Sequence, residues 1–191
     1  MDNHKHFIIY KPYGYLSQFV NNQTTRTNKK LLGTLYNFPE GIMAIGRLDE
    51  TSEGLLLLTT NGKVSASIRS NKVEKEYYAQ VDGTITKEAI EKLKKGIIIC
   101  TNGSEYITKP CKAFAVKGSP IFPERAKKIR DERHGPTSWV SVTLREGKFR
   151  QVRKMTAAAG FPTLRLVRVR IGNIKLENMP AGKVMEVTNF D

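Results

Sequence analysis

Runs and alternations of apolar residues along the chain predict short strands separated by helices. Residues 6–10 have strand character, and Lys11-Pro12 with a turn at Gly14 stops that strand. Residues 55–58 are four consecutive leucines. This run predicts a strand buried on both faces, because exposure of one face would require alternation. Further strands are expected over 75–81, 97–99, 109–116, 138–144 and 164–171.

Capping residues mark the starts of two amphipathic helices. Asn61 is a suitable N-cap for a helix that runs to about Ser70. Thr86 caps a second helix, which Gly96 ends. The apolar stripe of that second helix consists of Ala89, Ile90 and Leu93.

A third helix is predicted over 149–159, with Gly160 as its C-cap. The residues at its apolar spacing are Phe149, Val152, Thr156 and Ala159. Its opposite side carries basic residues related by three and four positions, namely Arg150, Arg153 and Lys154. In the strand that follows, one face carries Arg165, Val167, Val169 and Ile171, and the other carries Leu166, Arg168 and Arg170.

Two polar stretches interrupt these elements. Residues 20–30 are expected to form a long exposed loop, and the densely charged residues 123–136 an exposed loop or frayed helix that orders when a partner binds. The order of elements predicts an α+β fold with a large, mostly antiparallel sheet.

The charge balance is the most informative bulk property. The chain has 191 residues with 39% hydrophobic residues, which excludes a disordered tail, and no apolar run is long enough for a membrane helix. Its 32 Lys and Arg against 18 Asp and Glu give a formal charge of +14, which favours a polyanion such as nucleic acid as partner. Charge alone is equally compatible with a soluble protein that is simply basic.

The cysteines and histidines carry no strong signal. Cys100 and Cys111 form no disulfide framework, so reduced thiols in a cytosolic protein are expected. Metal ligation by His4, His6 and His134 is poorly supported by their spacing. The chain start has no apolar segment of a secretory signal.

A group of charged residues around Asp49 is the first candidate for chemistry. Arg47, Glu50 and Glu53 lie with it between a probable strand and the leucine strand, at a sheet edge where loops build sites. A loop carboxylate paired with an arginine is the simplest interpretation. A magnesium-dependent phosphoryl site is an alternative, but no glycine-rich phosphate loop accompanies it.

Two further stretches could contact RNA. Tyr77 and Tyr78 are adjacent in a strand, so one belongs to the core and the other faces a cleft, where it could stack on a base. Residues 145–154 hold five basic side chains around a helix start, which favours phosphate binding, although a solvated basic face has the same pattern.

Taken together, these stretches resemble one family. The segments GRLDETSEGLLLLTTNG, KEYYAQVDG and REGKFRQVRKMTAAAGFPTLRLVRVRIG are similar to the ordered motifs of the RsuA/RluB/RluE/RluF group of pseudouridine synthases, and YKPYGYLSQF resembles the opening of that group. The endings PTSWVSVTL and GFPTLRLVRVRIG are especially similar to the RluE branch, which acts on large-subunit ribosomal RNA. The likeness covers nearly the whole chain. It implies a single catalytic domain over 1–191, with two lobes around a central cleft.

Two departures from many relatives are visible. Those enzymes carry an S4 RNA-binding domain ahead of the catalytic domain, whereas here the catalytic start lies near residue 6, so no such domain is expected. Arg150 stands where several relatives have His, although RluE-like members share the Arg.

The resemblance implies roles for individual residues. Asp49 matches the catalytic Asp, and Arg153 the basic residue that pairs with the catalytic carboxylate. Tyr77 matches the active-site Tyr, which stacks on the target base and is a candidate general base. Arg47 matches an RNA contact near the flipped nucleotide. The other RNA-binding positions expected are Lys148, Arg150, Lys154, Leu166 as pocket wall, and Arg168.

The implied reaction is isomerisation of uridine to pseudouridine in large-subunit ribosomal RNA. It needs no cofactor and no metal, and a cytoplasmic monomer is expected. The resemblance leaves open whether Asp49 attacks C1′, attacks the base or takes a proton from the sugar. A non-catalytic RNA-binding or ribosome-assembly protein on the same fold is the alternative from another functional class.

Overall fold

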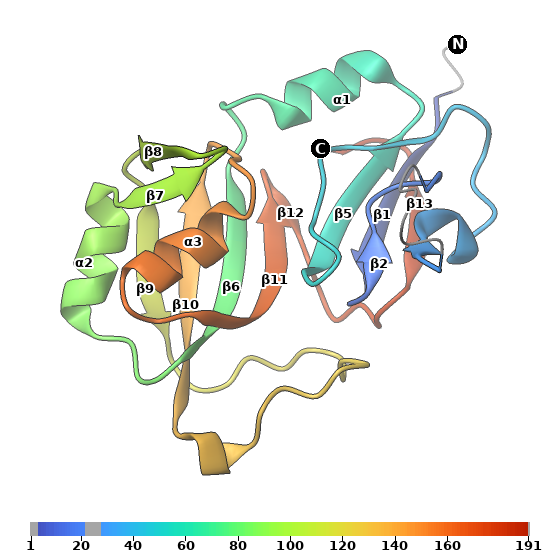
Figure 1. The fold of residues 1–191 in the computed structure, drawn as a ribbon. Coiled ribbons are helices and arrows are strands. Elements are labelled where there is room, and N and C mark those ends of the chain that lie inside the picture. Colours follow the sequence, from blue (N-terminus) through green and yellow to red (C-terminus); the bar gives the residue numbers. More distant parts are fainter. Residues whose placement is uncertain (1–3, 22–27, 191) are drawn as a thin grey trace. The chain divides into compact units, whose positions relative to one another are not determined.

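Two groups of strands, each with its own helices, make up the structure, a computed structural model that describes residues 4–21 and 28–190 (Figure 1). The first unit comprises Met1–Val73, Pro123–Lys127 and Arg168–Asp191. The second unit comprises Glu74–Phe122 and Lys128–Val167. Each unit has its own core, so each is described separately below.

In the first unit the strand β1 (His6–Lys11) lies between β5 (Glu53–Thr59) and β13 (Val184–Val187) and is antiparallel to both. The strand β4 (Met43–Ala44) pairs antiparallel with β5, and β2 (Tyr15–Leu16) pairs parallel with β3 (Lys30–Leu31). The remaining elements are the 3-10 helix η1 (Leu32–Thr34), α1 (Gly62–Arg69) and β12 (Ile174–Lys175).

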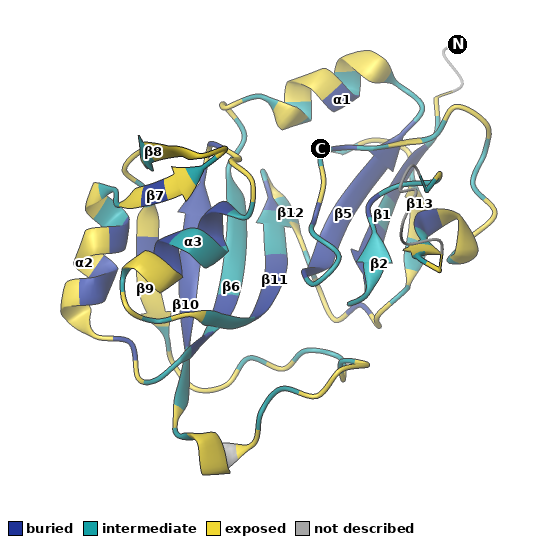
Figure 2. Cartoon of the chain, viewed as in Figure 1, coloured by how far each residue is buried: buried dark blue, intermediate teal, exposed yellow. Residues whose placement is uncertain are grey.

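The leucine strand β5 is the centre of this unit's core. Every residue of β5 is buried, as its uninterrupted apolar run predicts (Figure 2). Leu56 and Leu58 pack with Phe7 and Ile9 of β1 in one apolar cluster. Leu55 and Leu57 belong to a second cluster, which includes Ile45 and Ile171. Alternate leucines therefore serve two cores, which explains why this strand needs no polar face.

In the second unit β10 (Thr137–Leu144) lies between β6 (Lys75–Asp82) and β9 (Lys112–Val116) and is antiparallel to both. The strand β11 (Thr163–Ile171) lies next to β6 and continues along the chain into the first unit. The other elements are α2 (Lys87–Lys95), the antiparallel hairpin of β7 (Ile98–Thr101) and β8 (Ser104–Ile107), the 3-10 helix η2 (Glu132–His134) and α3 (Gln151–Ala158).

Both predicted helix starts are confirmed. The side chain of Asn61 accepts hydrogen bonds from the amides of Lys63 and Val64 at the start of α1. The side chain of Thr86 accepts from the amide of Ala89 at the start of α2. The predicted stripe of α2 is buried in a core cluster with apolar residues of β6 and β10. The α+β class with mostly antiparallel pairing is therefore confirmed.

Several element boundaries differ from those predicted. The strand β9 starts at Lys112 rather than at 109, and β8 was not predicted because its four residues have no sustained alternation. Of the loop predicted over 20–30, residues 22–27 lie outside the described part of the chain, and Lys30 belongs to β3. The charged stretch 123–136 is a loop whose single helical turn is η2.

The start of the third helix is also different, and here the apolar prediction was wrong. Phe149 was expected on the buried face but is 65% exposed, because α3 begins only at Gln151. Arg150, the N-cap, has a φ of 53°, so the chain turns there and Phe149 is off the helical register. For the same reason Arg150 does not share a helical face with Arg153. At the other end Ala159 is the C-cap and Gly160 follows it with a φ of 95°.

Gly96, which follows α2, cannot accept a side chain. Its φ is 100°, and a Cβ atom there would lie 2.3 Å from the carbonyl oxygen of Thr108. We expect Gly96→Ala to lower the free energy of unfolding by at least about 2 kcal/mol, measured by urea denaturation. Gly103 is the matched control, because its φ is 78° but a Cβ atom added there would meet no other atom within 4 Å. Gly103→Ala is expected to cost about 1 kcal/mol, and equal losses in the two variants would contradict the steric explanation.

Candidate active site

The loop that carries Asp49 is fixed by its backbone. Gly46 has a φ of 75°, which turns the chain after β4. Leu48 is buried, and Ser17 binds it at both backbone groups: the Ser17 Oγ donates to the Leu48 carbonyl at 2.8 Å and accepts from its amide at 2.9 Å. The carbonyl of Asp49 accepts from the amide of Ser52 at 3.0 Å, which closes a turn before β5. The residues on either side of Leu48 are therefore held at defined positions.

These flanking residues are the predicted site residues Arg47 and Asp49. Arg47 is exposed and Asp49 is half-buried, whereas Glu53, at the start of β5, is buried. An exposed arginine next to a partly shielded carboxylate suits contact with a polyanion beside a reactive group. The first unit thus presents both residues from one short loop.

Lys11 is a buried cation close to this loop. It is fully buried at the end of β1, and its Nζ donates to the carbonyls of Pro12 at 2.9 Å and Tyr15 at 2.7 Å. Burial lowers the pKa of Lys11 to about 7, while the negative charges of Glu53, Asp49 and Glu50 act in the opposite direction. Lys11 is therefore electrostatically coupled to the predicted catalytic carboxylate within the first unit.

Arg168 is a second buried cation of the first unit. It is 4% exposed, and its Nε donates to the carbonyl of Leu55 in β5 at 2.8 Å. Its charge also lowers the pKa of Lys11. Such a position suits an electrostatic role toward the carboxylates of this unit, and the predicted RNA contact of Arg168 stays a prediction.

The acidic residues near Asp49 do not form a metal site. Both carboxylate oxygens of Glu50 accept from the Nζ of Lys29 at 2.7 Å. Across residues 4–21 and 28–190, His, Cys, Asp and Glu side chains form no group of three that could hold a metal ion. A magnesium site would require several oxygen ligands converging on one point.

In the second unit Tyr77 and Leu166 are brought together by one core. Leu166 is 5% exposed and belongs to the apolar cluster that joins β6, β10, α2 and α3, and Tyr77 packs against that cluster while partly exposed. Tyr78 contacts Phe122 instead, with 6.2 Å between ring centroids. The tandem tyrosines therefore face opposite sides of β6. Both are partly exposed, so neither is the core residue that the sequence predicted, and Tyr77 has the exposure that stacking on a base requires.

The basic residues of the last motif surround the start of α3. Arg153 is partly buried, and its Nη1 donates to the carbonyl of Thr163 at 3.2 Å, which ties α3 to the start of β11. Lys148 is exposed, whereas Arg150 and Lys154 are partly exposed. These cations come from one short stretch of chain and give this end of the second unit a local positive charge.

The charged stretch 123–136 is held by internal ion pairs at several points. Arg130 forms a two-pronged ion pair with Asp82 of β6, and Arg133 pairs with Asp131 at 2.5 Å. In the first unit the guanidinium of Arg125 lies 4.5 Å from the ring centroid of Tyr13. Part of the positive charge expected to bind RNA is therefore already paired within the protein.

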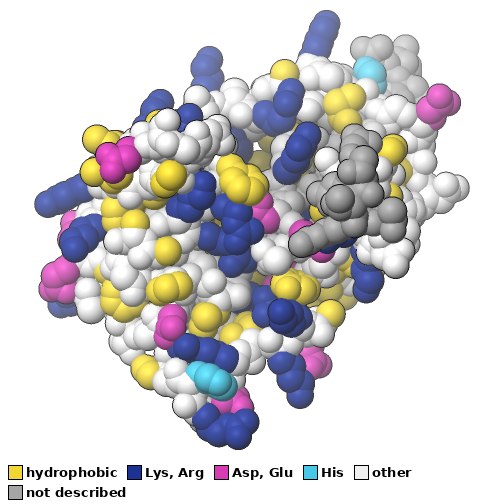
Figure 3. All heavy atoms as spheres, viewed as in Figure 1, with side chains coloured by type: hydrophobic (Ala, Val, Ile, Leu, Met, Phe, Trp, Pro, Cys, Tyr) yellow, Lys and Arg dark blue, Asp and Glu magenta, His cyan; other side chains and the backbone are white. Residues whose placement is uncertain are grey.

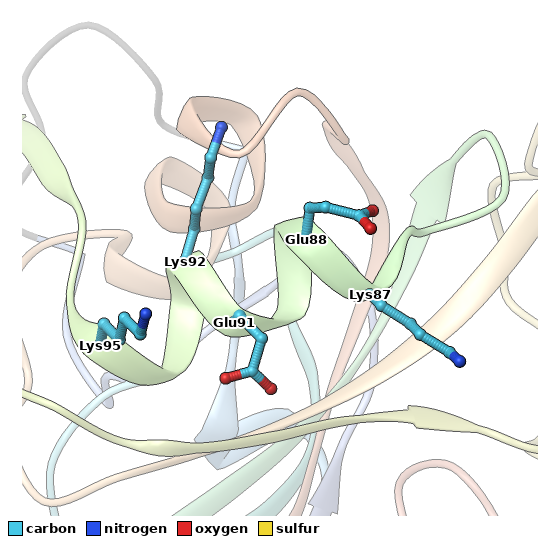
Figure 4. A pocket seen from close by; sticks show the side chains of 5 residues that line it. All are labelled: Lys87, Glu88, Glu91, Lys92 and Lys95. Carbon is cyan, nitrogen blue, oxygen red and sulfur yellow. The ribbon is translucent and has the colours of Figure 1, made fainter.

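A hollow on the outer face of α2 does not have the character of a site. It has a volume of about 350 Å³ and is lined by Lys87, Glu88, Glu91, Lys92 and Lys95. Figure 4 shows these side chains projecting away from the helix with both signs of charge. Mixed charge on an exposed helix is typical of a solvated surface.

Basic side chains are more widespread than acidic ones on one face of the molecule. On the face shown in Figure 3, Lys and Arg (dark blue) are spread widely and acidic side chains are few, in agreement with the formal charge of +14. No helix in the described residues is long and apolar enough to span a membrane.

Comparison with known proteins identifies the family. A sequence model of the family described as RNA pseudouridylate synthase matches residues 5–158. The chain belongs to that family. It is 37% identical over 189 residues to the ribosomal large subunit pseudouridine synthase E of Vibrio parahaemolyticus serotype O3:K6, covering 98% of this chain and 75% of the relative. It is 36% identical over 172 residues to the protein of that name from Xanthomonas axonopodis pv. citri, covering 89% of this chain and 87% of the relative.

A solved structure described as a pseudouridylate synthase has the same fold. It superposes with a TM-score of 0.74 at 25% identity and covers 98% of this chain and 72% of that one. The resemblance drawn from the motifs is thus confirmed at the level of the pseudouridylate synthase family and its fold.

Sequence reasoning missed two residues that act on the loop carrying Asp49 from elsewhere in the first unit. Lys11 was interpreted only as the end of a strand, and Ser17 was not considered. Both lie in the YKPYGYLSQF segment, which was recognised as similar to the family's opening. No local pattern marks either residue, because the burial of Lys11 depends on how β1 packs and the contact of Ser17 joins residues 31 positions apart.

Proposed function

We propose that this protein isomerises a specific uridine of large-subunit ribosomal RNA to pseudouridine. Family membership carries the reaction class, and the relatives named as large-subunit pseudouridine synthases support the substrate. The formal charge of +14 supports an RNA partner, because cationic side chains bind phosphates and release their counterions.

The reaction rearranges one nucleotide without an external donor. The N1–C1′ bond breaks, the uracil turns, and a C5–C1′ bond forms. C5 loses its proton to solvent, and N1 gains one, so atoms and charge balance without a redox step. No cofactor or metal is required by this balance, and we propose that none is used.

Asp49 is proposed as the catalytic carboxylate. The Ser17 contacts fix its loop, and the charge of Asp49 acts on the buried Lys11 of the same unit. Arg153 is proposed to pair with this carboxylate in the reacting complex, as the family resemblance implies. A fixed, ionised carboxylate is what nucleophilic or basic attack on the nucleotide needs.

Tyr77 is proposed to stack on the extruded uracil. Removing a uridine from its helix costs a few kcal/mol. Stacking on an aromatic ring contributes about 1–3 kcal/mol and offsets part of that cost. Leu166 is proposed as a wall of the same pocket. The proposed RNA contacts are Arg47, Lys148, Arg150, Lys154 and Arg168.

The resemblance to the family implies a single catalytic domain over residues 1–191, and we propose that the chain works as one. A ribosomal RNA substrate implies action in the cytoplasm, and we propose that a monomer is the active form.

Release of tritium from ribosomal RNA labelled at uracil C5 tests the proposed reaction. The purified protein is expected to release tritium from large-subunit RNA, with unchanged rate in EDTA. Tight binding of the RNA without release would refute an isomerase and favour a ribosome-assembly role. Loss of release in EDTA would instead revive a metal-dependent mechanism.

RNA affinity is expected to depend steeply on salt. If about six phosphates are neutralised, the association constant should fall by about 10³ between about 50 and about 200 mM monovalent salt. Filter binding at several salt concentrations measures this slope. A flat response would mean that the basic surface is not the RNA-binding surface.

A further inference from the structure

Phe149 is an exposed aromatic residue on an otherwise polar loop. The loop 145–150 connects β10 to α3, and Phe149 is 65% exposed within it. The neighbouring apolar residues of α3, Val152 and Met155, are buried in the core. An exposed aromatic ring offers a flat apolar surface on which a base can stack.

The loop is held in this conformation by a buried carboxylate. Glu146 is 8% exposed, and its Oε2 accepts from the hydroxyl of Tyr106 at 2.5 Å. Its Oε1 accepts from the amide of Lys109 at 2.9 Å and from the Nε2 of Gln151 at 2.6 Å. Although burial raises the pKa of Glu146, these hydrogen bonds lower it overall. An ionised Glu146 therefore fastens the loop to the β7–β8 hairpin and to α3.

Gln151 completes this attachment on the side of Phe149. The side-chain Oε1 of Gln151 accepts from the backbone amide of Lys148 at 2.9 Å, and the backbone amide of Gln151 donates to the carbonyl of Lys148 at 3.1 Å. Arg150 then turns the chain with its φ of 53°. Phe149 lies between Lys148 and Arg150, whose conformations these contacts fix, so the loop itself holds Phe149 in its exposed position.

One cationic side chain lies over the Phe149 ring, and others belong to the same stretch of chain. The Nζ of Lys154 lies 5.3 Å from its centroid, and the Nζ of Lys148 lies 4.5 Å from the ring centroid of Tyr106. Arg145 adds a further exposed cation at the start of the loop. A flat apolar ring with one ammonium group over it and another in the preceding residue is complementary to a nucleotide, which has a flat base and an anionic phosphate.

We propose that Phe149, with Lys148 and Lys154, is a stacking platform for an unpaired base of the RNA substrate, separate from the target uridine. This proposal rests on the proposed RNA substrate. One ring with flanking cations is too small and too charged for a stable protein–protein core, which favours nucleic acid over a protein partner. The platform contributes to RNA affinity and to the choice of a site with an adjacent unpaired nucleotide, but not to the chemical step.

Kinetics on a ribosomal RNA fragment test the platform. Phe149→Ala is expected to raise KM about tenfold with kcat changed less than about twofold, because stacking on one base is lost. Phe149→Trp should restore KM to the wild-type value, whereas Phe149→Leu, apolar but not flat, should behave as the Ala variant. Phe114 of β9, 49% exposed, is the matched control, and Phe114→Ala should leave KM unchanged. An unchanged KM for Phe149→Ala, or rescue by Leu as complete as by Trp, would overturn the platform.

Binding of a single-stranded oligonucleotide separates this proposal from the proposed reaction. The affinity of the wild-type chain should exceed that of Phe149→Ala about tenfold, and the fluorescence of Phe149→Trp should be quenched on binding. The native Trp139 is 7% exposed and serves as the unquenched background. Quenching and weakened binding support the platform even if no tritium is released, a result that would refute only the proposed reaction. Equal affinities of wild type and Phe149→Ala, without quenching in Phe149→Trp, would overturn the platform. An effect of Phe149→Ala confined to RNA with bound ribosomal proteins would assign the ring to a protein partner instead.

Discussion

Asp49→Asn is expected to abolish tritium release from ribosomal RNA, with a loss of at least about 10³-fold in kcat. The amide has the size of the carboxylate but can neither attack as an anion nor take a proton. The loop should survive the change, because Ser17 holds it through the backbone of Leu48 rather than through Asp49. RNA affinity is therefore expected to stay within about threefold of wild type, as measured by filter binding.

Glu40→Gln is the control for this variant. Glu40 is an exposed carboxylate of the same unit, and its neutralisation changes the charge by the same amount. It should retain activity within about twofold. If Asp49→Asn were as active as Glu40→Gln, the carboxylate of Asp49 would have no chemical role, and the basic chain would be better described as an RNA-binding protein.

The burial of Lys11 is expected to make stability depend on pH. The pKa of Lys11 is about 7 in the folded chain against an ordinary value of 10.5. Between these values the unfolded chain binds the extra proton, so the free energy of unfolding rises with pH, by about 1.4 kcal/mol per pH unit for this group. Lys11→Met removes the titrating group while keeping an apolar stem in the core. The difference in unfolding free energy between wild type and Lys11→Met should therefore shift by about 2 kcal/mol in favour of wild type from about pH 7 to about pH 9, because Lys11 is already half deprotonated in the folded chain at pH 7.

Urea denaturation at a series of pH values measures this difference. The range stops near pH 9 because burial raises the pKa of Cys111 to about 11 from 9.0, and that group makes stability fall as the pH rises further. Lys63→Met, at an exposed position of α1, is the control. Its curve of unfolding free energy against pH should have the same shape as that of wild type. A Lys11→Met curve parallel to wild type would mean that Lys11 keeps its charge when buried.

Much of the fold follows from local patterns. The buried run of β5 and the capped starts of α1 and α2 each depend on residues within a few positions, so local chemistry is sufficient to predict them. The helix stripe of α2 was predictable for the same reason. The hairpin strand β8 was not, because four mostly exposed residues carry no apolar period.

Phe149 shows where a periodic pattern misleads. Its spacing to Val152 and Thr156 fits a helix, but the positive φ of Arg150 and the contacts of Glu146 place it outside α3. Those contacts join residues from β8, a loop and α3, and no local rule predicts such a network. A non-glycine residue at positive φ is also uncommon enough that pattern analysis passes over it.

The candidate site was also predictable only in part. From the residues alone, Asp49 was more naturally a structural loop carboxylate, and only the ordered motifs of the family favoured catalysis. The charges that act on this region in the first unit, Lys11 and Arg168, are both buried. Burial of a lysine depends on how strands pack, so its lowered pKa could not be predicted from the sequence.

The central claim is that this chain makes one or more pseudouridines in large-subunit ribosomal RNA through Asp49. Mapping pseudouridines in ribosomal RNA from cells that lack the gene, complemented with wild type or with Asp49→Asn, tests it most directly. We expect at least one large-subunit pseudouridine to disappear in the deletion and to return with the wild-type copy alone. An unchanged pseudouridine map in the deletion, or full restoration by Asp49→Asn, would contradict the claim.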